Sequence, residues 1–374
     1  MKFAKGYRLL AGLAGPRIRA VNGCGGAFAA DGPLRKDTLR LLRNGRCLGA
    51  AVCLFGRTGI TGTLFAGSGG ESGPVIPGMY FRLASVTKMV TAAVAAGLAA
   101  DGIADPDRDI GDYLGVRVRA PGFDDTPVTL AMLLNHTASV RDSDLLFRAE
   151  KGLPLEAALK EMRFTGARPG EAFAYSNEGA ALAGAVLEAA SGKDLDTLLE
   201  EEFGPCGTYF PSRLPADTAL SDAVRILPRR TTAWSGAAHV RETPEKTGAD
   251  PRRHYGRAHG SLCMKSEALA KVTWRIMTED RYGAMRRPAV PFGERDPQIT
   301  EGSGMFIVRG DQVPGGEALG HQGLAYGAAH GVFYRPDTQK GFVLLTSGCS
   351  LARRYVLTDL NLAAMAFFLG DEKT

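Results

Sequence analysis

The fold of this chain is decided by the stretch Ser85-Val86-Thr87-Lys88 and by the apolar run, residues 89–100, that follows it. Thr91 is the only polar side chain in that run, so the run has no polar face and predicts a helix buried on all sides. A helix over residues 85–100 would be about 24 Å long at ~1.5 Å per residue, enough to pass through the middle of a domain. Asp101-Gly102 then marks its end.

Ser85 and Lys88 lie three residues apart in the first turn of this predicted helix, so their side chains share one face. Burial and the positive end of the helix dipole both disfavour a charged lysine at this position. A neutral amine beside a hydroxyl makes a serine nucleophilic. The alternative, a helix-capping serine and a surface lysine, is opposed by the buried run behind the pair. We therefore predict that Ser85 is a catalytic nucleophile and Lys88 its base.

Tyr175-Ser176-Asn177 is the second candidate group, and it directly precedes a predicted helix. Beside Lys88, Tyr175 would have its phenolate favoured, and it could relay the proton of Ser85 and later protonate the leaving group. The amide of Asn177 could bind both a substrate carbonyl and Lys88. The alternative is that Asn177 only caps the helix that begins near Glu178.

His321-Gln322-Gly323 is the third group, at the start of a predicted strand. Gly323 would allow the substrate backbone to approach closely. The backbone N–H of Leu324, with that of Ser85, could form an oxyanion hole. His321 could hold a substrate carboxylate or tune the tyrosine, or it could be purely structural.

Composition excludes several classes of function. The chain has 374 residues and a net charge of +5, but its arginine pairs are scattered and not interleaved with aromatic residues, which argues against nucleic-acid binding. The six cysteines form no Cys-x-x-Cys motif and the chain contains no His-x-x-x-His motif, so we expect neither a metal ion nor a cofactor. The aspartates of residues 105–112 do not match a calcium-binding loop, so we expect them to cap a helix or form a turn. No run approaches the ~20 apolar residues of a membrane span.

Strand patterns occur at both ends of the chain, and helical patterns fill the middle. Residues 47–55 and 60–66 predict a hairpin, and residues 304–309, 323–335 and 340–347 predict further strands. We expect an α/β fold with an inserted all-α part: an antiparallel sheet flanked by helices, formed by residues 35–84 and 296–374. Residues 85–295 would form a mainly helical domain with long loops, and residues 1–34 an N-terminal extension. Predicted helices in the middle and last parts include residues 126–136, 178–190, 195–203, 266–278 and 354–369.

Ser-x-x-Lys, Tyr-x-Asn and His-x-Gly, in this chain order, resemble the serine β-lactamase and penicillin-binding protein superfamily. The resemblance covers about residues 35–365 and is strongest to the class C β-lactamase branch and its esterase, D-aminopeptidase and carboxypeptidase relatives. Further similar segments are Phe81-Arg82-Leu83-Ala84, Leu133-Leu134-Asn135-His136-Thr137, Pro169-Gly170 and Gly260-Ser261-Leu262. In this resemblance the His136 position is structural.

The chain departs from this family's pattern at two positions. Ala138-Ser139 stand where the family commonly has Ser-Gly, so we expect a different turn there. His321 stands where β-lactamases of this branch usually carry lysine, which favours an esterase or amidase-like relative. Lys246-Thr247-Gly248 spells the third motif of many members, but Pro251 and charged residues follow it, so we predict an exposed loop and assign the role to His321.

The resemblance implies a serine hydrolase that forms an acyl-enzyme on Ser85 and cleaves an ester, amide or β-lactam bond of a small molecule, with no nucleic-acid partner. The alternative is a non-catalytic module on the same fold that binds β-lactams or peptidoglycan fragments. The N-terminal segment resembles a signal peptide with a short apolar part, but Arg17 and Arg19 follow closely, which favours a cytoplasmic location. The sequence predicts no oligomeric state.

Overall fold

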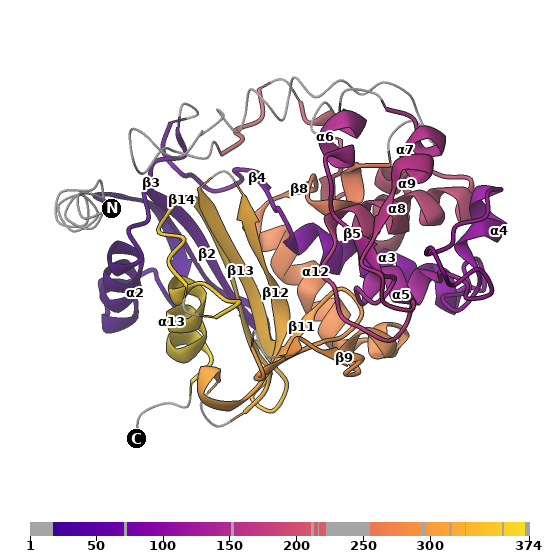
Figure 1. The fold of residues 1–374 in the computed structure, drawn as a ribbon. Helices are drawn as coiled ribbons and strands as arrows, with labels where there is room; N and C mark the ends of the chain where they lie inside the picture. Colours follow the sequence, from indigo (N-terminus) through magenta and orange to yellow (C-terminus); the bar gives the residue numbers. More distant parts are fainter. Residues whose placement is uncertain are drawn as a thin grey trace, which may run out of the picture.

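The computed structural model describes residues 18–70, 73–150, 153–210, 213–215, 217–221, 255–293, 296–313, 316–325, 327–353 and 355–370. Its largest element is a nine-stranded antiparallel sheet in the order β1-β3-β2-β14-β13-β12-β11-β10-β9 (Figure 1). The strands are β1 (Val21–Gly26), β2 (Gly49–Gly56), β3 (Gly59–Gly67), β9 (Val290–Pro291), β10 (Ile299–Glu301), β11 (Phe306–Val308), β12 (Ala318–Ala325), β13 (Ala328–Arg335) and β14 (Lys340–Gly348). The predicted antiparallel sheet is thus confirmed.

The two ends of the chain meet in the middle of this sheet. Strand β14 pairs with β2 in a register that places Val343 opposite Cys53, and it pairs on its other side with β13, where Val343 lies opposite Val332. All three side chains are fully buried, because helices cover both faces of the sheet there. The strands from the N-terminal and C-terminal parts of the sequence therefore form one continuous sheet.

Helices α2 (Pro33–Asn44) and α13 (Asp359–Phe368) cover one face of the sheet, and α12 (Ser266–Thr278) covers the other, beyond which lie the remaining helices (Figure 1). Each face has its own apolar core. Leu42 and Met365 belong to the core under α2 and α13, whereas Leu269 and Val90 belong to the larger core on the opposite side. The sheet thus separates an outer helical layer from the region that contains the predicted site.

The larger core is organised around α3 (Val86–Ala100), as the apolar run predicted. Helix α3 contacts α8 (Asn177–Ser191), α9 (Leu195–Phe203) and two short 3₁₀ helices, η3 (Arg257–His259) and η4 (Asp280–Arg286). The other helices in the described residues are α4 (Ile110–Leu114), α5 (Leu130–Leu134), α6 (Leu145–Glu150), α7 (Leu155–Glu161) and η6 (Gly310–Gln312). Two small sheets complete this part: β4 (Phe81–Arg82) with β8 (Cys263–Met264) and β7 (Gly207–Thr208), and β5 (Val140–Arg141) with β6 (Arg163–Phe164).

Several predicted elements have the predicted bounds. Helices α9 and α12 match to the residue, and the hairpin of β2 and β3 lies where the two apolar runs indicated. Within residues 105–112, Asp109 caps α4 by accepting a hydrogen bond from the backbone N–H of Gly111, which confirms the predicted capping role. None of the helices in the described residues is long and apolar enough to cross a membrane.

Other predicted elements were wrong. Strand β1 lies inside the expected N-terminal extension and pairs with β3, so these residues belong to the sheet. The expected strand over 323–335 is two antiparallel strands, β12 and β13, and α12 packs on the sheet although it was assigned to the helical domain. Helices α5 and α13 begin later than predicted, because Thr129 and Thr358 cap them.

Candidate active site

Ser85 immediately precedes α3 and follows a residue with unusual backbone geometry. Ala84 has a φ of 49°, the left-handed region that side chains other than glycine adopt at some cost. The preceding residues are fixed by two hydrogen bonds, from Leu83 N–H to the carbonyl of Leu262 (2.8 Å) and from Arg82 Nε to the carbonyl of Gly260 (3.0 Å). The chain therefore turns sharply at Ala84 and presents Ser85 at the start of the helix.

Lys88 is buried, with 3% of its surface exposed, and its amine lies between three oxygens. Its Nζ is 3.2 Å from Ser85 Oγ, 2.9 Å from Asn177 Oδ1 and 2.7 Å from the carbonyl oxygen of His259. Burial lowers the pKa of Lys88 to about 7, against the opposing effect of the Asp142 and Glu301 carboxylates. A substantial share of Lys88 is therefore the neutral amine at neutral pH.

Tyr175 lines the cavity with Ser85, and Lys88 Nζ lies over the Tyr175 ring, 5.0 Å from the centroid. Burial raises the pKa of Tyr175 above its ordinary value, although the neighbouring Ser85 hydroxyl acts in the opposite direction. The expectation that Lys88 favours a phenolate is therefore wrong, because the lysine faces the ring and desolvation dominates. Tyr175 is a phenol that can donate a proton.

Asn177 is the first residue of α8, but it is not the cap. Ser176 caps α8 with its hydroxyl, which accepts from Gly179 N–H (2.9 Å), and this leaves the Asn177 amide free to reach Lys88. The other end of that amide donates to Asp142 Oδ2 (2.7 Å). Asn177 therefore does not cap α8 but bridges Lys88 and Asp142.

Asp142 and the carbonyl of His259 were missed by the sequence reasoning. Asp142 accepts hydrogen bonds from Ser176 Oγ (2.9 Å) and Glu178 N–H (3.0 Å) as well as from Asn177. It thereby fixes the segment that carries Tyr175 and Asn177. No spacing in the sequence indicates this role, since Asp142 lies 34 residues or more from its partners.

His321, in the middle of β12, is 1% exposed, and its ring stacks on Phe306 with a centroid distance of 4.2 Å. Its Nδ1 lies 2.6 Å from the carbonyl oxygen of Gln322, which assigns the proton to Nδ1. Nε2 has no hydrogen-bond partner within the described residues. Burial lowers the pKa of His321 to about 3, so the ring is neutral and offers a substrate an acceptor nitrogen but no positive charge.

Gly323 lies against the backbone that leads to Ser85. A Cβ at this position would be 2.2 Å from the carbonyl oxygen of Leu83, so only glycine fits without a shift. The close approach that requires this glycine is therefore made by residue 83 of the protein itself. It fixes β12, with His321 and Leu324, next to Ser85.

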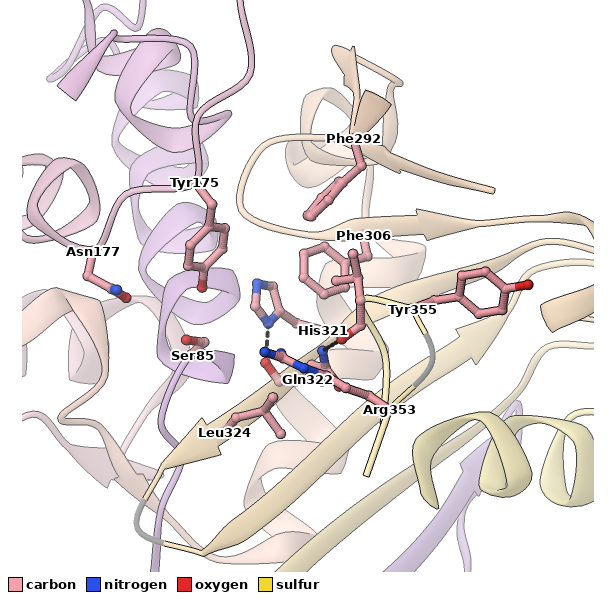
Figure 2. Close-up of a pocket in the computed structure, with 11 residues that line it drawn as sticks. Ser85, Tyr175, Asn177, Phe292, Phe306, His321, Gln322, Leu324, Arg353 and Tyr355 are labelled. Atoms are coloured by element: carbon pink, nitrogen blue, oxygen red, sulfur yellow. Dashed lines mark hydrogen bonds between the residues drawn. The ribbon is translucent and has the colours of Figure 1, made fainter. Parts of the chain in front are cut away.

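The three predicted motifs meet at one cavity of about 490 Å³. Ser85, Tyr175 and Asn177 line it from the helical side, and Phe292, Phe306 and His321 line it from the sheet (Figure 2). The remaining lining residues are Gln322, Leu324, Arg353, Tyr355 and Val356. This volume suits a small-molecule ligand.

Two further expectations concern loops. A different turn was expected at Ser139, where the family commonly has glycine. Ser139 has a φ of 62°, a left-handed conformation that glycine adopts without strain. Lys246, assigned to an exposed loop, lies outside the described residues. Among those residues, no group of three or more His, Cys, Asp and Glu side chains could hold a metal ion.

Comparison with known proteins gives the same family resemblance as the motifs. A family model described as "Beta-lactamase" matches residues 34–364. A D-aminopeptidase of Cereibacter sphaeroides is 26% identical over 298 residues, which cover 73% of this chain and 51% of the relative. The chain thus spans about half the length of this curated relative.

Solved structures show the same fold at low sequence identity. An octameric penicillin-binding protein homologue from Pyrococcus abyssi has a TM-score of 0.69 at 18% identity, over 90% of this chain and 77% of its own. A D-amino acid amidase from Ochrobactrum anthropi has a TM-score of 0.67 at 17% identity, over 91% and 98%. The hydrolase EstCE1 has a TM-score of 0.69 at 19% identity, over 89% and 97%.

Proposed function

The chain belongs to the Beta-lactamase family, and from this premise we propose that it is a serine hydrolase acting through an acyl-enzyme on Ser85. The observation that carries the proposal is the Lys88 amine, buried, 3.2 Å from Ser85 Oγ and with a pKa lowered to about 7. A lysine that is partly neutral at neutral pH can serve as a general base.

In the proposed reaction, Ser85 Oγ attacks a carbonyl carbon of the substrate and loses its proton to Lys88 Nζ. The negative charge that develops on the carbonyl oxygen is stabilised by the backbone N–H groups of Ser85 and Leu324. Lys88 and Tyr175 return the proton to the leaving group as the bond to it breaks, which leaves an ester on Ser85. Water then attacks this ester, activated by the same groups, and frees the serine.

The bond that is cleaved is an ester, amide or β-lactam bond of a small molecule. The D-aminopeptidase and D-amino acid amidase among the similar proteins favour a small amide or ester. Phe292 and Phe306 line the cavity opposite Ser85, which supports an apolar or aromatic group on the substrate (Figure 2). The neutral His321 would contact the substrate or Tyr175 through its unpaired Nε2.

Covalent labelling tests the proposal. Intact-protein mass spectrometry after treatment with a fluorophosphonate or a penicillin is expected to show one added group on the wild-type protein and none on Ser85→Ala. The matched control is Ser191→Ala, at the far end of α8, which should label like the wild type. Labelling that persists in Ser85→Ala would contradict the assignment.

Turnover distinguishes an enzyme from a binding module. A chromogenic ester and amides of D-amino acids should be hydrolysed by the wild type and not by Ser85→Ala. Acylation by penicillin without turnover of any of these substrates would favour the binding module instead.

A further inference from the structure

Glu301, the last residue of β10, is a fully buried carboxyl group with no hydrogen-bond partner for either oxygen within the described residues. Burying an unsatisfied carboxyl group is costly, so such a group in a native protein calls for a functional or structural explanation. The mechanism proposed above does not use Glu301.

The strand pairing places Glu301 beside a residue that lines the cavity. Glu301 lies directly opposite Phe306 in the antiparallel pair of β10 and β11, and directly opposed residues project to the same face. Phe306 lines the cavity and stacks on His321. The Glu301 side chain therefore lies on the same face of the sheet as Phe306, but it is fully enclosed.

The turn that follows Glu301 packs directly against α3 at Lys88. Gly304 has a φ of 67°, and a Cβ there would be 2.5 Å from the Cβ of Ala92 and 2.9 Å from the carbonyl oxygen of Lys88. Its N–H donates to the carbonyl of Leu134 (2.9 Å). A small cavity of about 10 Å³, lined in part by Lys88, His136 and Gly304, lies at this contact. The backbone thus holds the β10–β11 turn against the base.

Within the part of the chain that the structure describes, Lys88 is the cationic group whose charge acts on Glu301. It favours the ionised carboxylate, against a burial effect that raises the pKa of Glu301 well above its ordinary value. In return, Glu301 favours the protonated form of Lys88. Among the described residues, the other titratable groups that interact with Lys88 include His136 after α5, Asp142 after β5, Tyr175 before α8, His259 in η3 and His321 on β12. The two carboxylates, Asp142 and Glu301, are the groups that favour the ammonium.

We propose that Glu301 is a positioning residue that shares the proton equilibrium of Lys88, so that the base at Ser85 is the Lys88–Glu301 pair. The inference rests on the proposed serine hydrolase function. In interacting groups of this kind, the measured pKa values belong to the pair and not to either residue. An ionised Glu301 favours the ammonium form of Lys88, whereas a protonated Glu301 does not, so the pair sets how readily Lys88 accepts a proton from Ser85.

The pH profile of kcat/KM for ester hydrolysis tests the pairing. Glu301→Gln keeps the shape of the side chain but cannot ionise, so the Lys88 ammonium loses the carboxylate that can stabilise it, and the pKa of Lys88 falls. The acid limb of the profile is therefore expected to move to lower pH by about one unit, the size of effect that a nearby opposite charge has on a pKa. The control Glu171→Gln, an exposed residue in the turn before Tyr175, should keep the wild-type limb.

A limb of Glu301→Gln that coincides with the wild-type limb would overturn the inference. If this variant does not fold, the wild type is tested instead by infrared difference spectroscopy over the pH range of the acid limb. A buried carboxyl group is expected to titrate over the same pH range as activity. If no carboxyl signal titrates there, the inference is overturned equally. Fluorophosphonate labelling of Ser85 separates the two proposals. If Ser85 is labelled but the acid limb of Glu301→Gln does not move, only the pairing of Lys88 with Glu301 is contradicted. If the wild-type protein is neither labelled nor able to hydrolyse the ester, the hydrolase proposal is contradicted.

Discussion

Burial determines the protonation state of Lys88, and this has a consequence for stability as well as for catalysis. The folded protein lowers the pKa of Lys88 from 10.5 to about 7. Between these values the unfolded chain binds a proton that the native protein does not hold, so stability rises with pH over this window. Below about pH 7, Lys88 is protonated in both the folded and the unfolded protein, so the folded protein bears the full free-energy cost of burying the ammonium.

We predict that the stability of the wild type, relative to Lys88→Met, increases as the pH rises from about 7 toward the ordinary pKa of lysine, 10.5. Methionine has no proton to lose, so the variant lacks this pH-dependent contribution to the free energy of unfolding. Urea unfolding at both ends of the window measures the difference. The exposed Lys160, replaced by methionine, is the control, and a pH-independent difference for Lys88→Met would contradict the lowered pKa.

Lys88 and Tyr175 both adjoin Ser85, so we predict that they act as one unit. Lys88→Ala and Tyr175→Phe should each lower kcat by roughly a hundredfold or more, the usual scale for the loss of a general base. The double variant should be little slower than the slower single variant, because groups that act together are not additive. Steady-state kinetics on one ester measures this; full additivity would mean that the two side chains act separately.

At the scale of the element, β12 carries the third motif and depends on one glycine. We predict that Gly323→Ala lowers stability by ~1–3 kcal/mol, the cost of overpacking, and lowers turnover as well, because β12 must move away from Ser85. The added Cβ would lie 2.2 Å from the Leu83 carbonyl oxygen. Thermal unfolding and ester hydrolysis check both effects.

Gly32→Ala provides the control for this prediction. Gly32 is the N-cap of α2, and a Cβ there meets no atom within 4 Å, so activity should stay at the wild-type level. Stability should fall by under ~1 kcal/mol, because alanine is a poorer N-cap than glycine. If Gly323→Ala were as stable and active as Gly32→Ala, the close contact between β12 and residue 83 would not constrain the site.

At the scale of the whole molecule, a buried ion pair connects α8 to the segment that supplies the His259 carbonyl. Arg257 Nη2 in η3 is 2.5 Å from Glu188 Oε1, and the two side chains are 9% and 1% exposed. The same η3 segment presents the His259 carbonyl to Lys88. The pair therefore joins the packing of the helical region to the position of Lys88.

We predict that Arg257→Met destabilises the protein by ~3–5 kcal/mol, because it leaves the Glu188 carboxylate buried without its partner. Replacing both residues, as Arg257→Met with Glu188→Leu, should restore much of the loss. The exposed pair of Arg148 and Glu161 is the control: Arg148→Met should cost under ~1 kcal/mol. Urea unfolding of the four proteins measures these values, and equal losses for the two single arginine variants would contradict the prediction.

The sequence by itself determined the features that depend on local pattern. An apolar run without a polar face could only be a buried helix, and α3 is that helix. The order of Ser85, Lys88, Tyr175, Asn177 and His321, each in a short motif, was sufficient to select residues that line or adjoin one cavity. The family and the antiparallel sheet followed from these motifs and from the strand patterns at both ends.

Only the tertiary structure decided which distant groups surround Lys88 and how they are ionised. Asp142, the His259 carbonyl and Glu301 belong to no recognisable spacing, since they reach the site through three different segments of the chain. Strand β1 was missed because its glycine-rich sequence pairs at the sheet edge without an apolar pattern. Ionisation depends on desolvation and on charges brought close by folding, and a linear sequence contains neither distance nor burial.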